Sequence, residues 1–394
     1  MSQKVSFSGI PSSAYVHIPF CRRRCFYCDF PVSVVGDRLR GETSGTISQY
    51  VEVLCQEIAI TPALGEPLKT IFFGGGTPSL LSTLQLQRIL AALEQKFGIS
   101  PGAEISMEMD PGTFDFAHIS GYRSLGVNRV SLGVQAFQDE LLKLCGRSHS
   151  VADIFAAVEL IRQVEVPEFS LDLISGLPHQ SLDLWHDSLE KAVALIPTHI
   201  SIYDLTIEPG TAFGRYFKPG DRPLPTDEAT VKMYQTAQQV LTSAGYEHYE
   251  ISNYAKPGHQ CRHNRVYWEN RPYYGFGMGA ASYVEGKRFN RPRKTKEYYS
   301  WVEAGCVVDC EMTPRDEVLL DTLMLGLRLA EGLDLGVLAV EFGEEKVEEI
   351  CKCMRSHFEK GWVEVVEGRL RLCDPEGFLF SNVVLAGLFG ELGE

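Results

Sequence analysis

The sequence predicts an α/β fold: a partial (β/α)6 barrel followed by a smaller C-terminal α+β, winged-helix-like domain. Three observations support this. Six short apolar runs alternate with five amphipathic segments in the first half of the chain, as in parallel βαβ units. Glycines directly follow several of these runs. The length of 394 residues and a hydrophobic content of 44% allow one large domain plus a smaller one.

The barrel strands are predicted from short runs with strong β propensity. In chain order they are Ala14–Ile18, Thr70–Phe73, Glu104–Glu108, Arg129–Val134, Glu168–Ile174 and His199–Tyr203. The helices between them have apolar residues at helical spacing: Ile47–Ile60, Leu84–Phe97, Phe114–Leu125, Val151–Gln163 and Leu182–Leu195. The carboxyl ends of parallel strands meet at one rim, so we expect the chemistry there.

The pattern changes after Pro209. A loop rich in glycine, proline and charge precedes a predicted helix at Asp227–Ala244, and residues 246–283 are dense in aromatics and expected to be irregular. The C-terminal order of helices and a hairpin resembles a winged-helix module. Its helices are Arg315–Leu329, Leu335–Phe342 and Glu345–Lys360, with the hairpin turn at Glu367–Gly368. We divide the chain into a barrel (1–209), a linker and aromatic-rich region (210–305) and a winged-helix-like domain (306–394).

Composition excludes several classes of function. The formal net charge of -14 repels phosphates, so we expect no nucleic-acid binding and assign the winged helix a scaffold role. No apolar run approaches the roughly 20 residues of a membrane-spanning helix. Neither a secretory signal nor a transit peptide is recognisable, so a cytoplasmic location is predicted. Eleven cysteines, an odd number in such a chain, indicate reduced thiols available for metal rather than disulfides.

Three cysteines stand close together near the start of the chain. Cys21, Cys25 and Cys28 have C-x3-C-x2-C spacing, which suits three irons of a [4Fe–4S] cluster and leaves the fourth iron without a protein ligand. A structural zinc site needs four ligands, and the chain has no second C-x2-C pair. Zinc with His17 as its fourth ligand remains the alternative.

The cysteine loop, with Tyr27 before the last cysteine, resembles the signature of the radical S-adenosylmethionine superfamily. The series YVHIPFC, FFGGGTPSLL, EMDPGTF, SLGVQAF and DLISGLP resembles its coproporphyrinogen-oxidase-like subgroup. The resemblance implies a barrel of the radical S-adenosylmethionine type. It also implies that S-adenosylmethionine chelates the open iron and is cleaved by one electron from the cluster. The basic run Arg22–Arg24 would suit docking of an acidic electron donor, a flavodoxin-like protein or a ferredoxin.

The resemblance also implies a set of S-adenosylmethionine contacts. Glycines at a strand end allow a cationic amino group to approach backbone carbonyls, carboxylates and amides accept ribose hydroxyls, and a guanidinium can fork onto a carboxylate. By their match to the subgroup, the cofactor contacts are Tyr15, Gly75, Gly76, Thr77, Glu108, Gln135, Arg147 and Asp172. We predict no catalytic residue.

The subgroup contains oxygen-independent coproporphyrinogen III oxidases and haem chaperones of the HemW type. Three features favour the chaperones: Tyr15 lies near the start, Phe30 stands where the oxidases have a fourth cysteine, and the HNxxYW stretch from His263 to Trp268 resembles the chaperones' haem-binding signature. The resemblance implies that this protein binds haem and passes it to a haem-accepting protein.

Chemistry permits this role for the HNxxYW stretch. The imidazole of His263 can ligate haem iron, Tyr267 and Trp268 can cover a porphyrin, and Cys261 is an alternative ligand. Without the resemblance, a histidine hydrogen-bonded in the core is the more ordinary interpretation. Two other functions stay open: an oxidase that decarboxylates coproporphyrinogen, and a winged-helix regulator that uses the cluster as a redox switch.

Overall fold

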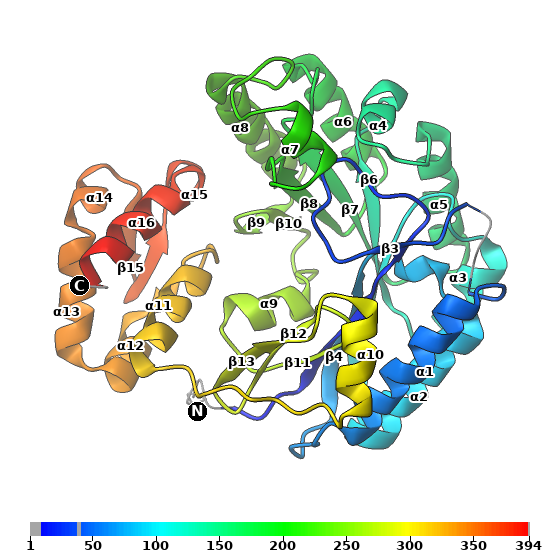
Figure 1. The fold of residues 1–394 in the computed structure, drawn as a ribbon. Helices are drawn as coiled ribbons and strands as arrows, with labels where there is room; N and C mark the ends of the chain where they lie inside the picture. The colour runs from blue at the N-terminus through cyan, green and yellow to red at the C-terminus, as the bar shows by residue number, and fades with distance from the viewer. Residues whose placement is uncertain (1–8, 38–40, 393–394) are drawn as a thin grey trace.

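The computed structural model describes residues 9–37 and 41–392, and Figure 1 shows their arrangement. A large barrel-like sheet covered by helices stands beside a smaller C-terminal group of helices and strands. The outer ends of the predicted first and last domains, residues 1 and 394, lie outside the described residues. In the part of the chain described, no helix has the length and apolar character needed to cross a bilayer.

The large sheet has nine strands in the order β11-β1-β4-β5-β6-β7-β8-β10-β9. All six predicted strands are present and run parallel. They are β1 (Ser13–Ile18), β4 (Leu68–Gly75), β5 (Ile99–Met109), β6 (Arg129–Gln135), β7 (Glu168–Ser175) and β8 (His199–Asp204). Among the described residues β9 and β11 do not pair, so the barrel is partial, as predicted.

Helices cover the outside of this sheet (Figure 1). They are α1 (Gly45–Ile60), α2 (Thr83–Phe97), α3 (Phe116–Ser124), α4 (Asp139–Leu144), α5 (Val151–Gln163) and α6 (Leu182–Ala194). Their starts follow from the sequence, because a serine or aspartate caps the first turn of five of them. Ser82 and Gln85 form a reciprocal capping box on α2. The buried helix faces and the strands together form one hydrophobic core.

The aromatic-rich segment 246–283 is not irregular, contrary to the prediction. It extends the barrel sheet at both edges: β11 pairs parallel with β1, and β10 pairs antiparallel with β8. The prediction failed because strands of three or four residues are too short to show a periodic pattern. The elements from this segment to residue 303 are β9 (Glu247–Glu250), β10 (Asn253–Ala255), α9 (Arg262–Trp268), β11 (Tyr274–Phe276), β12 (Ala281–Val284), β13 (Lys287–Asn290) and α10 (Thr295–Glu303). The proposed domain boundaries themselves stay predictions.

A buried ion pair fastens the β11 edge to the helices. Glu57 of α1 pairs with Arg291 at 2.8 Å, and the two side chains are 0% and 2% exposed. Tyr298 of α10 donates its hydroxyl to Glu57 at 2.6 Å, and the Gly277 N–H donates to it at 2.8 Å. Glu57 therefore joins α1 to three points between residues 277 and 298, which are 220 or more positions away in sequence.

The C-terminal part has a hydrophobic core of its own. Its elements follow the predicted winged-helix order, with a three-stranded sheet in the order β14-β16-β15. The predicted helix Glu345–Lys360 is interrupted at Met354. The elements are α11 (Arg315–Gly326), β14 (Leu333–Asp334), α12 (Leu335–Phe342), α13 (Glu344–Cys353), α14 (Arg355–Glu359), β15 (Val363–Val366), β16 (Arg369–Leu372), α15 (Glu376–Leu379) and α16 (Ser381–Leu392).

Candidate functional site

A cavity of about 430 Å³ lies at the carboxyl ends of the barrel strands. The structure brings together here almost all of the residues that the sequence assigned to the cluster and to S-adenosylmethionine. The predicted residues that line it are Cys21, Cys25, Cys28, Gly75, Gly76, Thr77, Glu108, Gln135, Arg147 and Asp172. Tyr15 differs, because it lines a neighbouring cavity inside the barrel.

The cysteine loop is held in place by its own backbone and by arginine. The Phe26 N–H donates to the Cys145 carbonyl at 2.9 Å, and the Cys28 N–H donates to the Cys25 carbonyl at 3.2 Å. Arg24 donates to the carbonyls of Cys28 and Phe30 at 3.3 and 3.1 Å. These bonds hold the turn that carries the three thiols along one wall of the cavity.

The three thiols fit a cluster better than a single ion. No three His, Cys, Asp or Glu side chains in the described ranges converge as a mononuclear metal requires. In a [4Fe–4S] cluster each thiolate would bind its own iron, so such convergence is unnecessary. His17, the alternative zinc ligand, is engaged elsewhere: Nδ1 hydrogen bonds with the Tyr15 hydroxyl at 3.0 Å and Nε2 with the Pro31 carbonyl at 3.3 Å.

The cysteine thiols of the loop are partly buried, so they need a nearby positive charge to ionise at neutral pH. Burial, with a contribution from Asp110, raises the pKa of Cys21 to about 12, and burial also raises the pKa of Cys28. Since a thiolate is the form that ligates iron, the irons themselves would supply the charge that stabilises it. Arg147 adds a cation beside Cys25, with Nη1 at 3.4 Å from the sulfur.

The glycines at the end of β4 are required by close packing as well as by the cavity. Gly75 has φ +109°, and a Cβ there would lie 2.3 Å from the His17 ring. A Cβ on Gly76 would lie 2.7 Å from the Phe20 carbonyl oxygen. The Gly75 N–H donates to Glu108 Oε2 at 2.9 Å. The chain from His17 to Phe20 therefore leaves no room for a side chain at either glycine, even before a ligand is considered.

Two carboxyl groups face the cavity with raised pKa values. Burial, together with Asp172 and Asp110, raises the pKa of Glu108 to about 8, so Glu108 is largely protonated at neutral pH. Burial also raises the pKa of Asp172, which accepts hydrogen bonds from Ser131 at 2.9 and 2.8 Å. A protonated Glu108 can donate a hydrogen bond, whereas an ionised one only accepts.

We predict that Glu108→Gln changes the pH dependence of stability in cluster-free protein. A carboxyl whose pKa is raised on folding stabilises the fold most below its unfolded pKa, and this contribution is lost as pH rises towards 8. Glutamine has no proton to lose. Relative to wild type, the thermal midpoint of the variant should therefore increase from pH 6 to pH 9, by about 2 °C or more. A constant difference between pH 6 and pH 9 would contradict the raised pKa.

Arg147 was predicted to fork onto a ligand carboxylate, but in the structure its partners belong to the protein. Its Nη2 contacts the Asp110 carboxylate and donates to the Gly133 carbonyl at 2.9 Å. Asp110 was not among the predicted site residues, although it lies in the EMDPGTF motif next to the predicted strand end. Gln135 adopts φ +67°, an uncommon conformation for a residue other than glycine and one often found at functional sites.

The far side of the cavity contains residues that the sequence did not suggest. Tyr203 and Asp204 line it because β8 runs one residue beyond its predicted end. Thr206 and Glu208 follow in the loop after β8. Their only sequence signal was their position at a strand end.

The HNxxYW stretch forms α9, which packs against β4 inside the barrel opening. His263 is fully buried, and both ring nitrogens are engaged: Nδ1 with the Thr70 hydroxyl and Nε2 with the Tyr267 hydroxyl, each at 2.8 Å. Burial lowers the pKa of His263 to about 3, and its ring stacks on Phe72. In this conformation His263 is a neutral core histidine with no free nitrogen.

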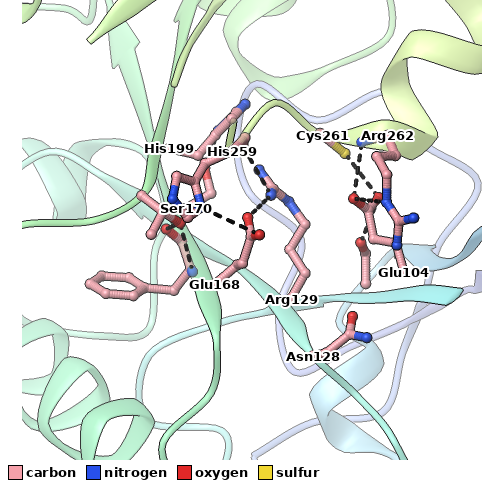
Figure 2. Close-up of polar contacts among 12 residues, drawn as sticks. Glu104, Asn128, Arg129, Glu168, Ser170, His199, His259, Cys261 and Arg262 are labelled. Atoms are coloured by element: carbon pink, nitrogen blue, oxygen red, sulfur yellow. Dashed lines mark hydrogen bonds and ion pairs between the residues drawn. The ribbon is translucent and has the colours of Figure 1, made fainter. Parts of the chain in front are cut away.

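Acidic and basic residues of the sheet hold α9 in position (Figure 2). Glu104 of β5 accepts from the backbone N–H groups of Arg262 and His263 at 2.9 and 3.0 Å. Arg129 of β6, ion-paired with Glu168 at 2.6 Å, donates to the His259 carbonyl at 3.2 Å in the segment just before the helix. The cavity beneath α9, which adjoins the cofactor cavity, is about 250 Å³, less than the roughly 300–1,000 Å³ of typical cofactor sites. This cavity by itself is too small for a porphyrin.

Curated proteins are similar to this chain over most of its length. The radical SAM superfamily model matches residues 15–192. The haem chaperone HemW of Synechocystis is 49% identical over 98% of both chains. HemW of Bacillus subtilis is 34% identical over 96% of this chain and 100% of its own length. The chain belongs to the HemW family. HemW of Escherichia coli, 42% identical over 73% of this chain and 74% of its own, agrees with this assignment.

The fold of this chain is also similar to that of a solved enzyme structure. A crystal structure of coproporphyrinogen III oxidase (HemN) from Escherichia coli, described as a radical SAM enzyme, has a TM-score of 0.83 to this chain. It is 25% identical and covers 96% of this chain and 90% of its own. The likeness extends beyond the barrel into the C-terminal part. The predicted fold class and family are therefore confirmed, including the smaller domain of helices and strands.

Proposed function

We propose that this protein is a haem chaperone that binds haem together with a [4Fe–4S] cluster and S-adenosylmethionine and transfers haem to an acceptor protein. The observation that carries the proposal is the full-length identity of 49% to a protein named as a haem chaperone. The clustering of the predicted cysteine and cofactor positions around one cavity supports the cluster and S-adenosylmethionine part of it.

In this proposal Cys21, Cys25 and Cys28 hold the cluster, whose open iron supplies chelation and one-electron chemistry to S-adenosylmethionine. The side chains of the protein would position S-adenosylmethionine. Glu108, whose pKa burial raises to about 8 in the chain alone, can donate as well as accept a hydrogen bond. Asp172, held by Ser131, presents acceptor oxygens to hydroxyl groups. Tyr15 stays assigned as a cofactor contact through its place beside Glu108 in the adjoining cavity.

His263 remains the proposed haem ligand, and the structure sets a condition on it. Its Nε2 must leave the Tyr267 hydroxyl before it can reach iron. Haem ligation by His263 therefore requires a movement of its side chain or of α9. We infer that the haem lies outside the barrel interior, because the cavity behind the helix is only about 250 Å³.

Anaerobic titration with haem tests the proposal. Wild-type protein should shift the Soret band of haem, because an axial imidazole changes the iron ligand field. His263→Ala should lose most of the shift, while His186→Ala, an exposed histidine on α6, should keep it. An unchanged Soret band with wild type would overturn the haem proposal. An equal Soret shift in both variants would show that His263 is not the haem ligand.

A second candidate is oxidative decarboxylation of coproporphyrinogen III, which the structural likeness to HemN favours. We expect no conversion of coproporphyrinogen III under anaerobic conditions with reductant and S-adenosylmethionine. Measurable product would make the oxidase the better assignment. For the third candidate, a DNA-binding regulator, the net charge of -14 is unfavourable.

Two further parts of the proposal concern partners and place. A flavodoxin-like or ferredoxin donor would approach the cluster loop at the basic run, where Arg23 is exposed but pairs with Asp37 at 2.7 Å. Part of this positive charge is thus already balanced within the chain. The haem acceptor and the cytoplasmic location rest on the family and on the sequence.

A further inference from the structure

The turn between α4 and α5 contacts the cysteine loop at three consecutive residues. The Cys145 carbonyl accepts a hydrogen bond from the Phe26 N–H at 2.9 Å. Gly146 lies against the Phe26 ring, because a Cβ on this glycine would come within 2.9 Å of it. Arg147 completes the contact, since its Nη1 donates to the Cys25 sulfur at 3.4 Å. The turn therefore supports the loop that carries the three thiols, and Arg147 reaches one of the sulfurs directly.

Acceptors on the opposite side of the guanidinium fix the direction of Arg147. Its Nη2 donates to the Gly133 carbonyl at 2.9 Å and contacts the Asp110 carboxylate. The Thr77 hydroxyl donates to the same carboxylate at 2.9 Å and holds it in place. Gly133 also leaves space for the pair, since a Cβ there would lie 2.8 Å from an Asp110 oxygen. Because Nη2 is held in this way, the planar guanidinium keeps Nη1 directed at Cys25.

The Arg147 guanidinium is a buried cation beside the thiols. Its side chain is only 8% exposed, so water screens its charge weakly. A guanidinium in a protein is always charged, and Asp110 balances this charge from the Nη2 side. The Cys25 sulfur therefore receives a charge-assisted N–H donor. Hydrogen bonds to the cysteine sulfurs, together with net charge and solvent exposure, set the reduction potential of an iron–sulfur cluster.

We propose that Arg147 donates a hydrogen bond to the cluster through Cys25 and thereby raises the reduction potential of the cluster. The inference rests on the proposed function, because it takes Cys25 as a ligand of the cluster. Reduction adds one negative charge to the cluster, so a cationic N–H donor stabilises the reduced form more than the oxidised form. A higher potential allows a weaker one-electron donor to reduce the cluster. Asp110 and Gly133 act as positioning residues, because they hold Arg147 in this orientation.

A redox titration of the reconstituted cluster, made without S-adenosylmethionine and followed by electron paramagnetic resonance, tests this role. Arg147→Gln should lower the midpoint potential, so that the ratio of reduced to oxidised cluster at a fixed potential falls by about tenfold or more. Arg147→Lys should recover part of this shift, because its ammonium group keeps the charge. The control is Arg215→Gln on α7 (Ala212–Tyr216), which packs on the cysteine loop through Phe213 and Phe26. Arg215 is exposed, so this variant should keep the wild-type potential.

Three results would overturn this role of Arg147 and leave the proposed function intact. The first is an unchanged midpoint potential in Arg147→Gln. The second is an equally lowered potential in Arg147→Gln and Arg147→Lys, since the shift would then reflect altered packing of the loop rather than lost charge. The third is loss of iron and sulfide from both Arg147 variants with full content in Arg215→Gln, which would show that Arg147 only holds the loop. Absence of a cluster from reconstituted wild-type protein would instead contradict the proposed function itself.

Discussion

Cys25→Ala should reduce the iron and acid-labile sulfide of anaerobically reconstituted protein to background. Cys25 lies at the centre of the cysteine loop, and its sulfur lies 3.4 Å from an Arg147 nitrogen in the cofactor cavity. With this thiol removed, the loop offers only two ligands, and a cluster held by two thiolates is not retained. Iron and sulfide analysis and the visible absorption of the cluster measure the effect.

A matched control separates ligand loss from general damage. Cys351 is a half-buried thiol on α13 of the C-terminal part, away from the cavity. Cys351→Ala removes the same atoms and should retain full iron and sulfide. Full iron content in Cys25→Ala, or equal losses in both variants, would show that Cys25 does not ligate a cluster.

Glu57→Gln should lower the free energy of unfolding by about 3–5 kcal/mol, because it leaves Arg291 charged and buried without its counter-ion. The glutamine amide would also place a donor where the Tyr298 hydroxyl and the Gly277 N–H now donate. Urea unfolding of the two proteins measures the difference.

Glu52→Gln is the control on the same helix. Glu52 is 60% exposed and lies 4.0 Å from Arg88, so its ion pair is weak and screened by solvent. We expect a change below about 1 kcal/mol. Similar effects of the two substitutions would mean that the Glu57 pair does not secure α1 to β11 and α10.

The barrel could be predicted from the sequence because its signals are local and repeated. In the strand Arg129–Val134, for example, the fully buried Val130, Leu132 and Val134 recur at every second position, and the helices begin at capping residues. The cysteine spacing and the strand-end polar residues likewise carry their signal within a few positions. These features suffice to place Glu108 and Asp172 on one rim.

The features that could not be predicted from the sequence depend on contacts between segments that are distant along the chain. β11 is three residues long, and it is a barrel strand only because it pairs with β1, more than 250 positions away. The Arg147–Asp110 pair and the burial of His263 between Thr70 and Tyr267 arise in the same way. A motif indicated a haem-ligating role for His263, but it did not reveal that both imidazole nitrogens are engaged in this conformation.

The most direct test of the account is the electron paramagnetic resonance spectrum of the reduced, reconstituted protein with and without S-adenosylmethionine. If Cys21, Cys25 and Cys28 hold a [4Fe–4S] cluster with one open iron, the spectrum should change when S-adenosylmethionine is added, because it binds that iron. A cluster signal that S-adenosylmethionine leaves unaltered, or protein that takes up zinc in place of iron and sulfide, would contradict it.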